Sequence, residues 1–126
     1  MGEISKKKVL IIEDDAFLVK AYQIRFSTEN VDAIVATNAD EAEPYFKKEP
    51  PDAVLLDLML PGTNGFELLE EMKKINAWKD VPVIIVSNLS QDKDIELGKK
   101  LGAIDYVVKA DTKVADVVVT VMKHMK

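Results

Sequence analysis

The chain has 126 residues, of which 48% are hydrophobic and 31% are charged, a composition that fits one folded globular domain and excludes a disordered or fibrous chain. Its 22 acidic and 17 basic residues give a net charge of -5, whereas surfaces that bind nucleic acid are normally basic and rich in arginine, so no nucleic-acid partner is expected. With no cysteine and a single histidine, the sequence excludes disulfides, thiolate catalysis and metal sites built from several histidines.

The first residues carry no recognisable targeting segment. Residues 1–8 are mostly polar, and the apolar run 9–12 is far too short for a signal peptide or a membrane span. We therefore expect a cytoplasmic protein with no membrane insertion. A single domain is predicted over residues 1–126, with a structured core over about 7–125.

Five short apolar segments rich in β-branched residues predict five strands. Four of them are almost continuously apolar, which is typical of strands covered on both faces in a parallel sheet. In chain order, the predicted strands cover residues 9–12, 31–36, 53–56, 81–86 and 104–108.

Segments with helical spacing follow the strands. Pro44 is expected to kink or shorten the helix in segment 38–49, Asn64 to cap the next helix, and Gly102 to end the helix over 91–101. Apolar stripes at helical spacing are formed by Leu18, Ala21, Tyr22 and Phe26, by Phe66, Leu68, Leu69 and Met72, and by Val114, Val117, Val118, Val121, Met122 and Met125. The alternation of strands and helices predicts an α/β fold, a doubly wound five-stranded parallel sheet with helices on both faces.

Polar side chains follow four of the predicted strands, at the carboxyl edge where such sheets carry their functional crevice. The residues are Glu13, Asp14 and Asp15, then Asp57, Ser87 and Lys109. Asp15 is expected to cap the first helix. The other carboxylates would repel one another at this edge unless a cation were present, and an all-oxygen ligand set suits Mg²⁺.

The same edge has the components of phosphoryl transfer. A carboxylate can act as a nucleophile and form an aspartyl phosphate, and Asp57 is the best candidate because the chain turns sharply after it. Lys109 would supply a positive charge and Ser87 a hydroxyl donor to the phosphate oxygens. These residues therefore predict phosphoryl transfer onto Asp57.

Taken together, these residues resemble the receiver domain of two-component response regulators, of the stand-alone, single-domain type. The resemblance extends from about residue 7 to the C-terminus and implies a flavodoxin-like strand order, 2-1-3-4-5. It is carried by the pair Glu13-Asp14, by the run from Asp57 to Gly65, which is similar to the family's D-x-x-x-P-x-x-x-G, by Ser87, and by Tyr106-Val107-Val108-Lys109.

The resemblance implies a role for each of these residues. Asp57 would receive a phosphoryl group from the phosphohistidine of a histidine kinase or a phosphotransfer protein. Mg²⁺ would be bound by Asp14, Asp57 and the backbone carbonyl of Met59, with Glu13 acting nearby through water.

It also implies a switch that passes the signal on. The Ser87 hydroxyl would move to the phosphoryl oxygens, the Tyr106 ring would turn inward, and Lys109 would pair with the phosphoryl group. The surface of segments 91–101, 104–108 and 114–125 would then dock onto a downstream protein. We expect a signalling domain rather than an enzyme, either a monomer or a dimer linked to phosphorylation.

Two positions depart from the family pattern. Ala110 follows Lys109 where the family often has a proline after a cis peptide bond, and a cis Lys-Ala bond would cost about 3 kcal/mol, so this loop is expected to be trans or strained. Asn88 follows Ser87 where a smaller residue is usual, which predicts an altered lifetime of the phosphorylated state.

Other functions fit the sequence less well. A phosphatase of the haloacid dehalogenase type needs a second Asp two residues after the nucleophile, where this chain has Met59. The glycine-rich loops of nucleotide-binding proteins are missing from the sequence. A receiver-like scaffold that no longer takes phosphate stays as the alternative. His124, near the end of a lysine-rich helix, is expected to be an ordinary surface residue.

Overall fold

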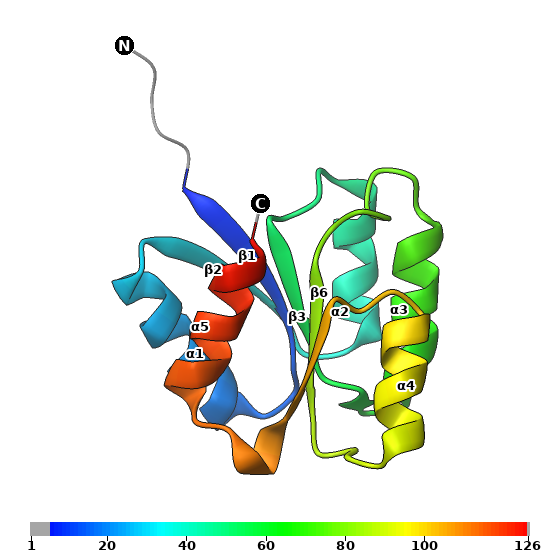
Figure 1. The fold of residues 1–126 in the computed structure, drawn as a ribbon. Coiled ribbons are helices and arrows are strands. Elements are labelled where there is room, and N and C mark those ends of the chain that lie inside the picture. The colour runs from blue at the N-terminus through cyan, green and yellow to red at the C-terminus, as the bar shows by residue number, and fades with distance from the viewer. Residues whose placement is uncertain (1–5, 126) are drawn as a thin grey trace.

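A five-stranded parallel sheet forms the centre of the protein (Figure 1), which is described here for residues 6–125 from a computed structural model. The strand order β2-β1-β3-β6-β7 is the predicted order 2-1-3-4-5, because β6 and β7 are the fourth and fifth strands of this sheet. The strands are β1 (Lys7–Ile12), β2 (Val31–Ala36), β3 (Ala53–Leu56), β6 (Val83–Ser87) and β7 (Asp105–Val108).

Helices cover both faces of the sheet, as the doubly wound fold requires. Helices α1 (Ala16–Thr28) and α5 (Val114–His124) lie together on one face, and α2 (Ala39–Ala42), α3 (Gly65–Lys74) and α4 (Asp92–Lys100) lie on the other (Figure 1). Short 3-10 helices, η1 (Glu43–Lys47) and η2 (Lys109–Asp111), follow α2 and β7. Within residues 6–125, no helix has the length and apolar character needed to cross a membrane.

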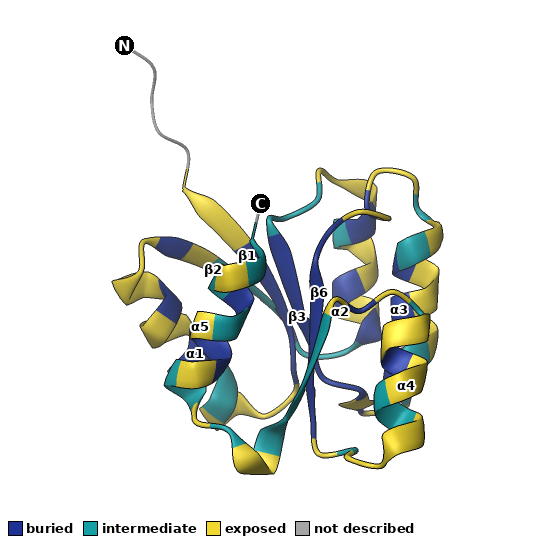
Figure 2. Ribbon diagram, viewed as in Figure 1, coloured by how far each residue is buried: buried dark blue, intermediate teal, exposed yellow. Residues whose placement is uncertain are grey.

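The sheet separates two hydrophobic cores. Along β1, Val9 and Ile11 contribute to the core under α1 and α5, whereas Leu10 and Ile12 contribute to the core under α2, α3 and α4. Strands β3 and β6 are buried along their whole length, and β1 is buried from Val9 to Ile12 (Figure 2). Burial on both faces explains why these strands are almost continuously apolar instead of alternating between apolar and polar residues.

The predicted helix boundaries are confirmed. The Asp15 carboxylate accepts hydrogen bonds from the backbone N–H groups of Phe17 and Leu18, and the Asn64 side chain accepts one from Phe66. At Pro44 the α-helical segment gives way to the 3-10 helix η1, so that helix is shortened as expected. Gly102 follows α4 with a φ of 115°, a conformation that favours glycine.

A small hairpin between β3 and α3 was not predicted. Strands β4 (Met59–Leu60) and β5 (Thr63–Asn64) pair in antiparallel fashion, and Gly62 lies in the turn with a φ of 66°. Strands this short show no alternating pattern in the sequence. The hairpin fixes the path of the chain immediately after Asp57.

The expectation for His124 is wrong, because this residue has a specific partner. Its Nε2 atom lies 3.0 Å from Oδ2 of Asp105, and the contact joins the end of α5 to the start of β7. The ring is mostly covered rather than freely exposed, with 19% of its side-chain surface accessible. No local sequence pattern signals this contact, because the two residues meet only when α5 packs back onto the sheet.

Candidate functional site

Three carboxylates meet at the carboxyl edge of the sheet, as predicted. Ligand atoms of Glu13, Asp14 and Asp57 all lie within 4.8 Å of one another. Backbone hydrogen bonds continue the sheet to this point: the Glu13 N–H donates to Ala36 at 3.1 Å, and the Asp57 N–H donates to Ile12 at 2.9 Å. Rigid strand ends therefore position the acidic cluster.

Lys109 reaches this cluster from the end of β7. Its Nζ lies 2.6 Å from Oε1 of Glu13 and 2.7 Å from Oδ2 of Asp57. The described residues include no cis peptide bond, so the bond from Lys109 to Ala110 is trans. Burial disfavours the charged form of Lys109, but the bonds to Asp57 and Glu13 outweigh it and raise the pKa of the ammonium group.

The cluster carries more negative charge than Lys109 can neutralise. Glu13 is fully buried and Asp57 is 3% exposed, while Asp14 faces solvent. Burial raises the pKa of the Glu13 carboxyl, and the nearby charge of Asp57 adds to this, although hydrogen bonds from Lys109 and the Asp15 N–H act in the opposite direction. Converging carboxylate oxygens with an exposed opening fit a hard divalent cation.

The two oxygens of Asp57 have different partners. Oδ1 accepts the backbone N–H of Met59 at 3.0 Å, and Oδ2 accepts the Lys109 ammonium. The first bond holds the Met59 backbone beside the Asp57 carboxylate. The Met59 side chain points away from the core and is 55% exposed.

Ser87 and Tyr106 are linked through the backbone of Leu89. The Leu89 N–H donates to Oγ of Ser87 at 3.3 Å, and the Tyr106 hydroxyl donates to the Leu89 carbonyl at 2.5 Å. Ser87 is fully buried, whereas Asn88 is exposed. Leu89 was not singled out from the sequence, because it takes part through its backbone and any residue type could do so.

Comparison with known proteins identifies the family to which this geometry belongs. Residues 9–119 match the response regulator receiver domain. The chain is a member of that family. Receiver domains are signalling domains, so the predicted class of function is confirmed at this level.

Curated relatives of this receiver domain are longer proteins. A probable transcriptional regulator, ycf27, of Porphyridium aerugineum is 39% identical over 106 residues, which cover 84% of this chain and 43% of the relative. The transcriptional regulatory protein BaeR of Escherichia coli is 33% identical over 102 residues, or 81% of this chain and 41% of the relative. The chain thus spans less than half the length of these relatives.

Solved structures show the same fold. The BeF3-activated N-terminal receiver domain of RstA from Klebsiella pneumoniae superposes with a TM-score of 0.82 at 30% identity, and the match covers 94% of this chain and 97% of that one. The chemotaxis protein CheY4 of Vibrio cholerae has a TM-score of 0.87 at 19% identity, covering 96% and 100% of the two chains. The second likeness concerns the fold alone.

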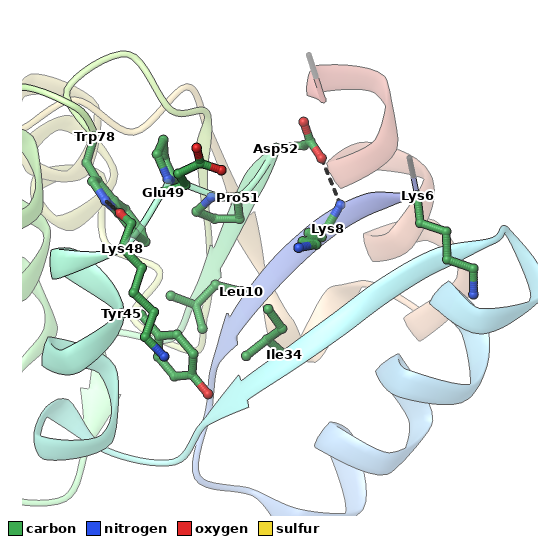
Figure 3. A pocket seen from close by; sticks show the side chains of 11 residues that line it. Lys6, Lys8, Leu10, Ile34, Tyr45, Lys48, Glu49, Pro51, Asp52 and Trp78 are labelled. Carbon is green, nitrogen blue, oxygen red and sulfur yellow. Dashed lines mark hydrogen bonds between the residues drawn. The ribbon is translucent and has the colours of Figure 1, made fainter. Parts of the chain in front are cut away.

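A separate hollow lies at the opposite edge of the sheet in this receiver domain (Figure 3). It has a volume of about 590 Å³ and includes the amino end of β1, so it lies far from the acidic cluster of Glu13, Asp14 and Asp57 at the carboxyl edge. Its floor is apolar, and Nζ of Lys48 lies 5.1 Å from the centre of the Tyr45 ring. The residues around it are Lys6, Lys8, Leu10, Ile34, Tyr45, Lys48, Glu49, Pro50, Pro51, Asp52 and Trp78.

Tyr22 connects the acidic cluster to the core of this receiver domain. It is 1% exposed on α1, and burial followed by the charge of Glu13 raises its pKa to about 12. In the unfolded chain the phenol ionises near pH 10, so the unfolded state loses its proton first. We expect stability to fall by about 2 kcal/mol between pH 10 and pH 12 because of this group alone.

The measurement is urea unfolding at several alkaline pH values. The native chain is compared with Tyr22→Phe, which should lack this loss, and with Tyr45→Phe, which should keep it. Equal pH dependence in the native and Tyr22→Phe proteins would contradict the assignment.

Proposed function

We propose that this receiver domain is a switch that accepts a phosphoryl group on Asp57 and passes the signal on by docking to another protein. The observation that carries the proposal is the setting of Asp57. Its carboxylate is almost buried, is held by the Met59 N–H and the Lys109 ammonium, and lies within ligand distance of two further carboxylates.

In the proposed reaction an oxygen of the Asp57 carboxylate attacks the phosphorus of a phosphohistidine. The new P–O bond forms as the P–N bond breaks, the imidazole leaves with the electron pair and takes up a proton, and an acyl phosphate results. Lys109 balances the negative charge on the transferred group, and the Ser87 hydroxyl donates to one of its oxygens. The donor is a histidine kinase or a phosphotransfer protein.

The acidic cluster supports Mg²⁺ as the metal. Asp14, Asp57 and the Met59 carbonyl would bind it, with Glu13 acting through water, because Mg²⁺ prefers oxygen ligands and keeps several of its waters. Bound there, the ion would neutralise charge on the phosphoryl oxygens. The Lys109 ammonium would then be free to turn from Glu13 toward the phosphoryl group.

The output surface is proposed to be α4, β7 and α5. Leu97, Ile104 and Val119 are exposed on or beside these elements, at 40%, 52% and 61%. Large apolar side chains exposed to solvent are a feature of protein interaction sites. A cytoplasmic location and a downstream protein target, reached by a monomer or a dimer linked to phosphorylation, are part of this proposal.

The test is phosphorylation of the full chain by acetyl phosphate with Mg²⁺. We expect a mass gain of one phosphoryl group that hydroxylamine removes, as for an acyl phosphate. Asp57→Asn should abolish the gain, and Asp80→Asn, an exposed aspartate outside the cluster, should keep it. A native chain that gains no mass, with either acetyl phosphate or a phosphorylated kinase, would favour the phosphate-independent scaffold.

Asn88 offers a prediction about the lifetime of the phosphorylated state. It is exposed directly after Ser87, where its amide can shield the phosphoryl group from water. Replacing Asn88 with Ala should speed dephosphorylation by roughly threefold to tenfold, a change of about 1 kcal/mol in the barrier. Decay is timed by the loss of the phosphorylated mass after the donor is removed. An unchanged decay rate, equal to that of the remote Asn76→Ala variant, would contradict the prediction.

A further inference from the structure

Helix α4 rests on the sheet through a glycine. Gly98 is the buried residue of α4, and a Cβ built on it would lie 2.7 Å from Cδ1 of Ile85. The same Cβ would lie 3.1 Å from Cδ2 and 3.3 Å from Cε2 of Tyr106. Glycine weakens a helix interior relative to alanine. Here it allows the helix backbone to lie directly on these two side chains.

Ile85 and Tyr106 form one surface beneath α4. They are register partners on the neighbouring parallel strands β6 and β7, so their side chains point to the same face of the sheet. Ile85 belongs to the core on that face, and Tyr106 packs against this core. One edge of the half-buried Tyr106 ring therefore lies against the backbone of α4.

The hydroxyl end of Tyr106 is also held. It donates to the carbonyl of Leu89, whose N–H donates to Oγ of Ser87. Leu89 lies in the loop that leads from β6 into α4. The ring thus contacts α4 at Gly98 and is bonded to the loop that follows Ser87.

We propose that Gly98 is a positioning residue for Tyr106: the missing side chain at this point of α4 leaves the space in which the ring packs inward, against the core. The inference rests on the proposed function, since it concerns the switch pair of the same site. If phosphorylation favours the inward ring, then by linkage a chain whose ring is held inward binds a phosphoryl analogue more tightly. The gain in affinity equals the factor by which the bound analogue shifts the equilibrium between the two ring positions.

Gly98→Ala is the direct test of this role. The added methyl group needs space that Ile85 Cδ1 and the ring edge occupy, so we expect the ring to shift by a few tenths of an ångström and its hydrogen bond to the Leu89 carbonyl to weaken. Alanine is a better helix former than glycine, so weakening of α4 itself would not explain such a change.

Ring position is measured in the full chain by fluorine NMR after labelling with 3-fluorotyrosine, without metal or phosphoryl donor. Tyr106→Phe assigns the resonance. In Gly98→Ala the Tyr106 signal should shift, while the signals of Tyr22 and Tyr45 stay in place. Glu96→Ala, on the exposed side of α4, is the matched control and should change nothing. An unmoved Tyr106 signal in folded Gly98→Ala overturns the proposal.

A second variant tests crowding as the cause. Ile85→Val removes Cδ1, the atom nearest to the added methyl group. The double variant Ile85→Val with Gly98→Ala should fold and should return the Tyr106 signal toward its native position. If the signal stays displaced in the double variant, lack of space at Gly98 is not what controls the ring, and the proposal fails.

The link to phosphorylation is measured with beryllofluoride and Mg²⁺. Gly98→Ala should bind this phosphoryl analogue roughly fivefold more weakly than the native chain. Equal affinity, with the ring displaced, would refute the coupling. A native chain that does not bind beryllofluoride at all contradicts the proposed function instead, and the NMR experiment then decides the role of Gly98 without it.

Discussion

Replacing Lys109 with methionine is expected to lower the free energy of unfolding by about 3 kcal/mol at pH 7 in buffer containing a chelator. The ammonium lies 2.6 Å from Glu13 and 2.7 Å from Asp57, and both carboxylates are buried. Methionine keeps much of the packing of the lysine stem but leaves two buried carboxylates facing each other without a counter-charge. Urea unfolding gives the measurement.

The loss should depend on pH in a definite direction. The pKa of Glu13 is already raised, and without Lys109 it should rise further, so Glu13 takes up a proton in the folded state before it does so in the unfolded chain. The loss of unfolding free energy in Lys109→Met is therefore largest near pH 7 and becomes smaller as pH falls toward 4. Added Mg²⁺ should also reduce this loss, because under the proposed function the ion would bind the same carboxylates.

Two control variants isolate the charge at this site. Lys100→Met removes an exposed lysine of α4 and should be close to neutral. Combining Lys109→Met with Glu13→Gln removes one of the two facing charges and should recover part of the loss. If Lys109→Met loses the same unfolding free energy at pH 7 and pH 4, then lost packing, rather than unpaired charge, is responsible.

The sequence was sufficient to predict the sheet and the acidic cluster for one physical reason. Parallel strands covered on both faces must be apolar along their length, so the charged residues that follow them stand out and meet at one edge. Asp57 and Lys109 could therefore be placed together although they are distant in the chain, and the trans bond to Ala110 leaves Lys109 aimed at the carboxylates.

Other features had no signal of this kind. The pairing of His124 with Asp105 depends on how α5 returns to the sheet, and Leu89 takes part only through its backbone. The contact of Gly98 with Tyr106 could not be foreseen either, because it depends on how closely α4 approaches β7. Such contacts follow from packing distances, which local patterns do not specify.

The largest effect of a single methyl group is expected at Gly65, where Gly65→Ala should destabilise the fold by about 3 kcal/mol or more. A Cβ on Gly65 would lie 2.4 Å from the Cα of Leu58 and 2.8 Å from its carbonyl oxygen, and neither backbone atom can turn aside as a side chain would. The Gly65 N–H also donates to that carbonyl at 3.1 Å. Urea unfolding of native and variant chains measures the loss.

Gly62, in the turn of the hairpin before α3, provides the matched control, because glycine is used there for a different reason. Its φ is 66°, and a Cβ there would meet nothing within 4 Å, so Gly62→Asn, with a residue that tolerates this conformation, should cost less than about 1 kcal/mol.

Leu58 is the neighbour of Asp57, so Gly65→Ala should also slow phosphorylation by acetyl phosphate in whatever fraction stays folded, whereas Gly62→Asn should not. If the two variants were equally stable, close approach of α3 to Leu58 would not be the reason for glycine at position 65, and the motif's last residue would need another explanation.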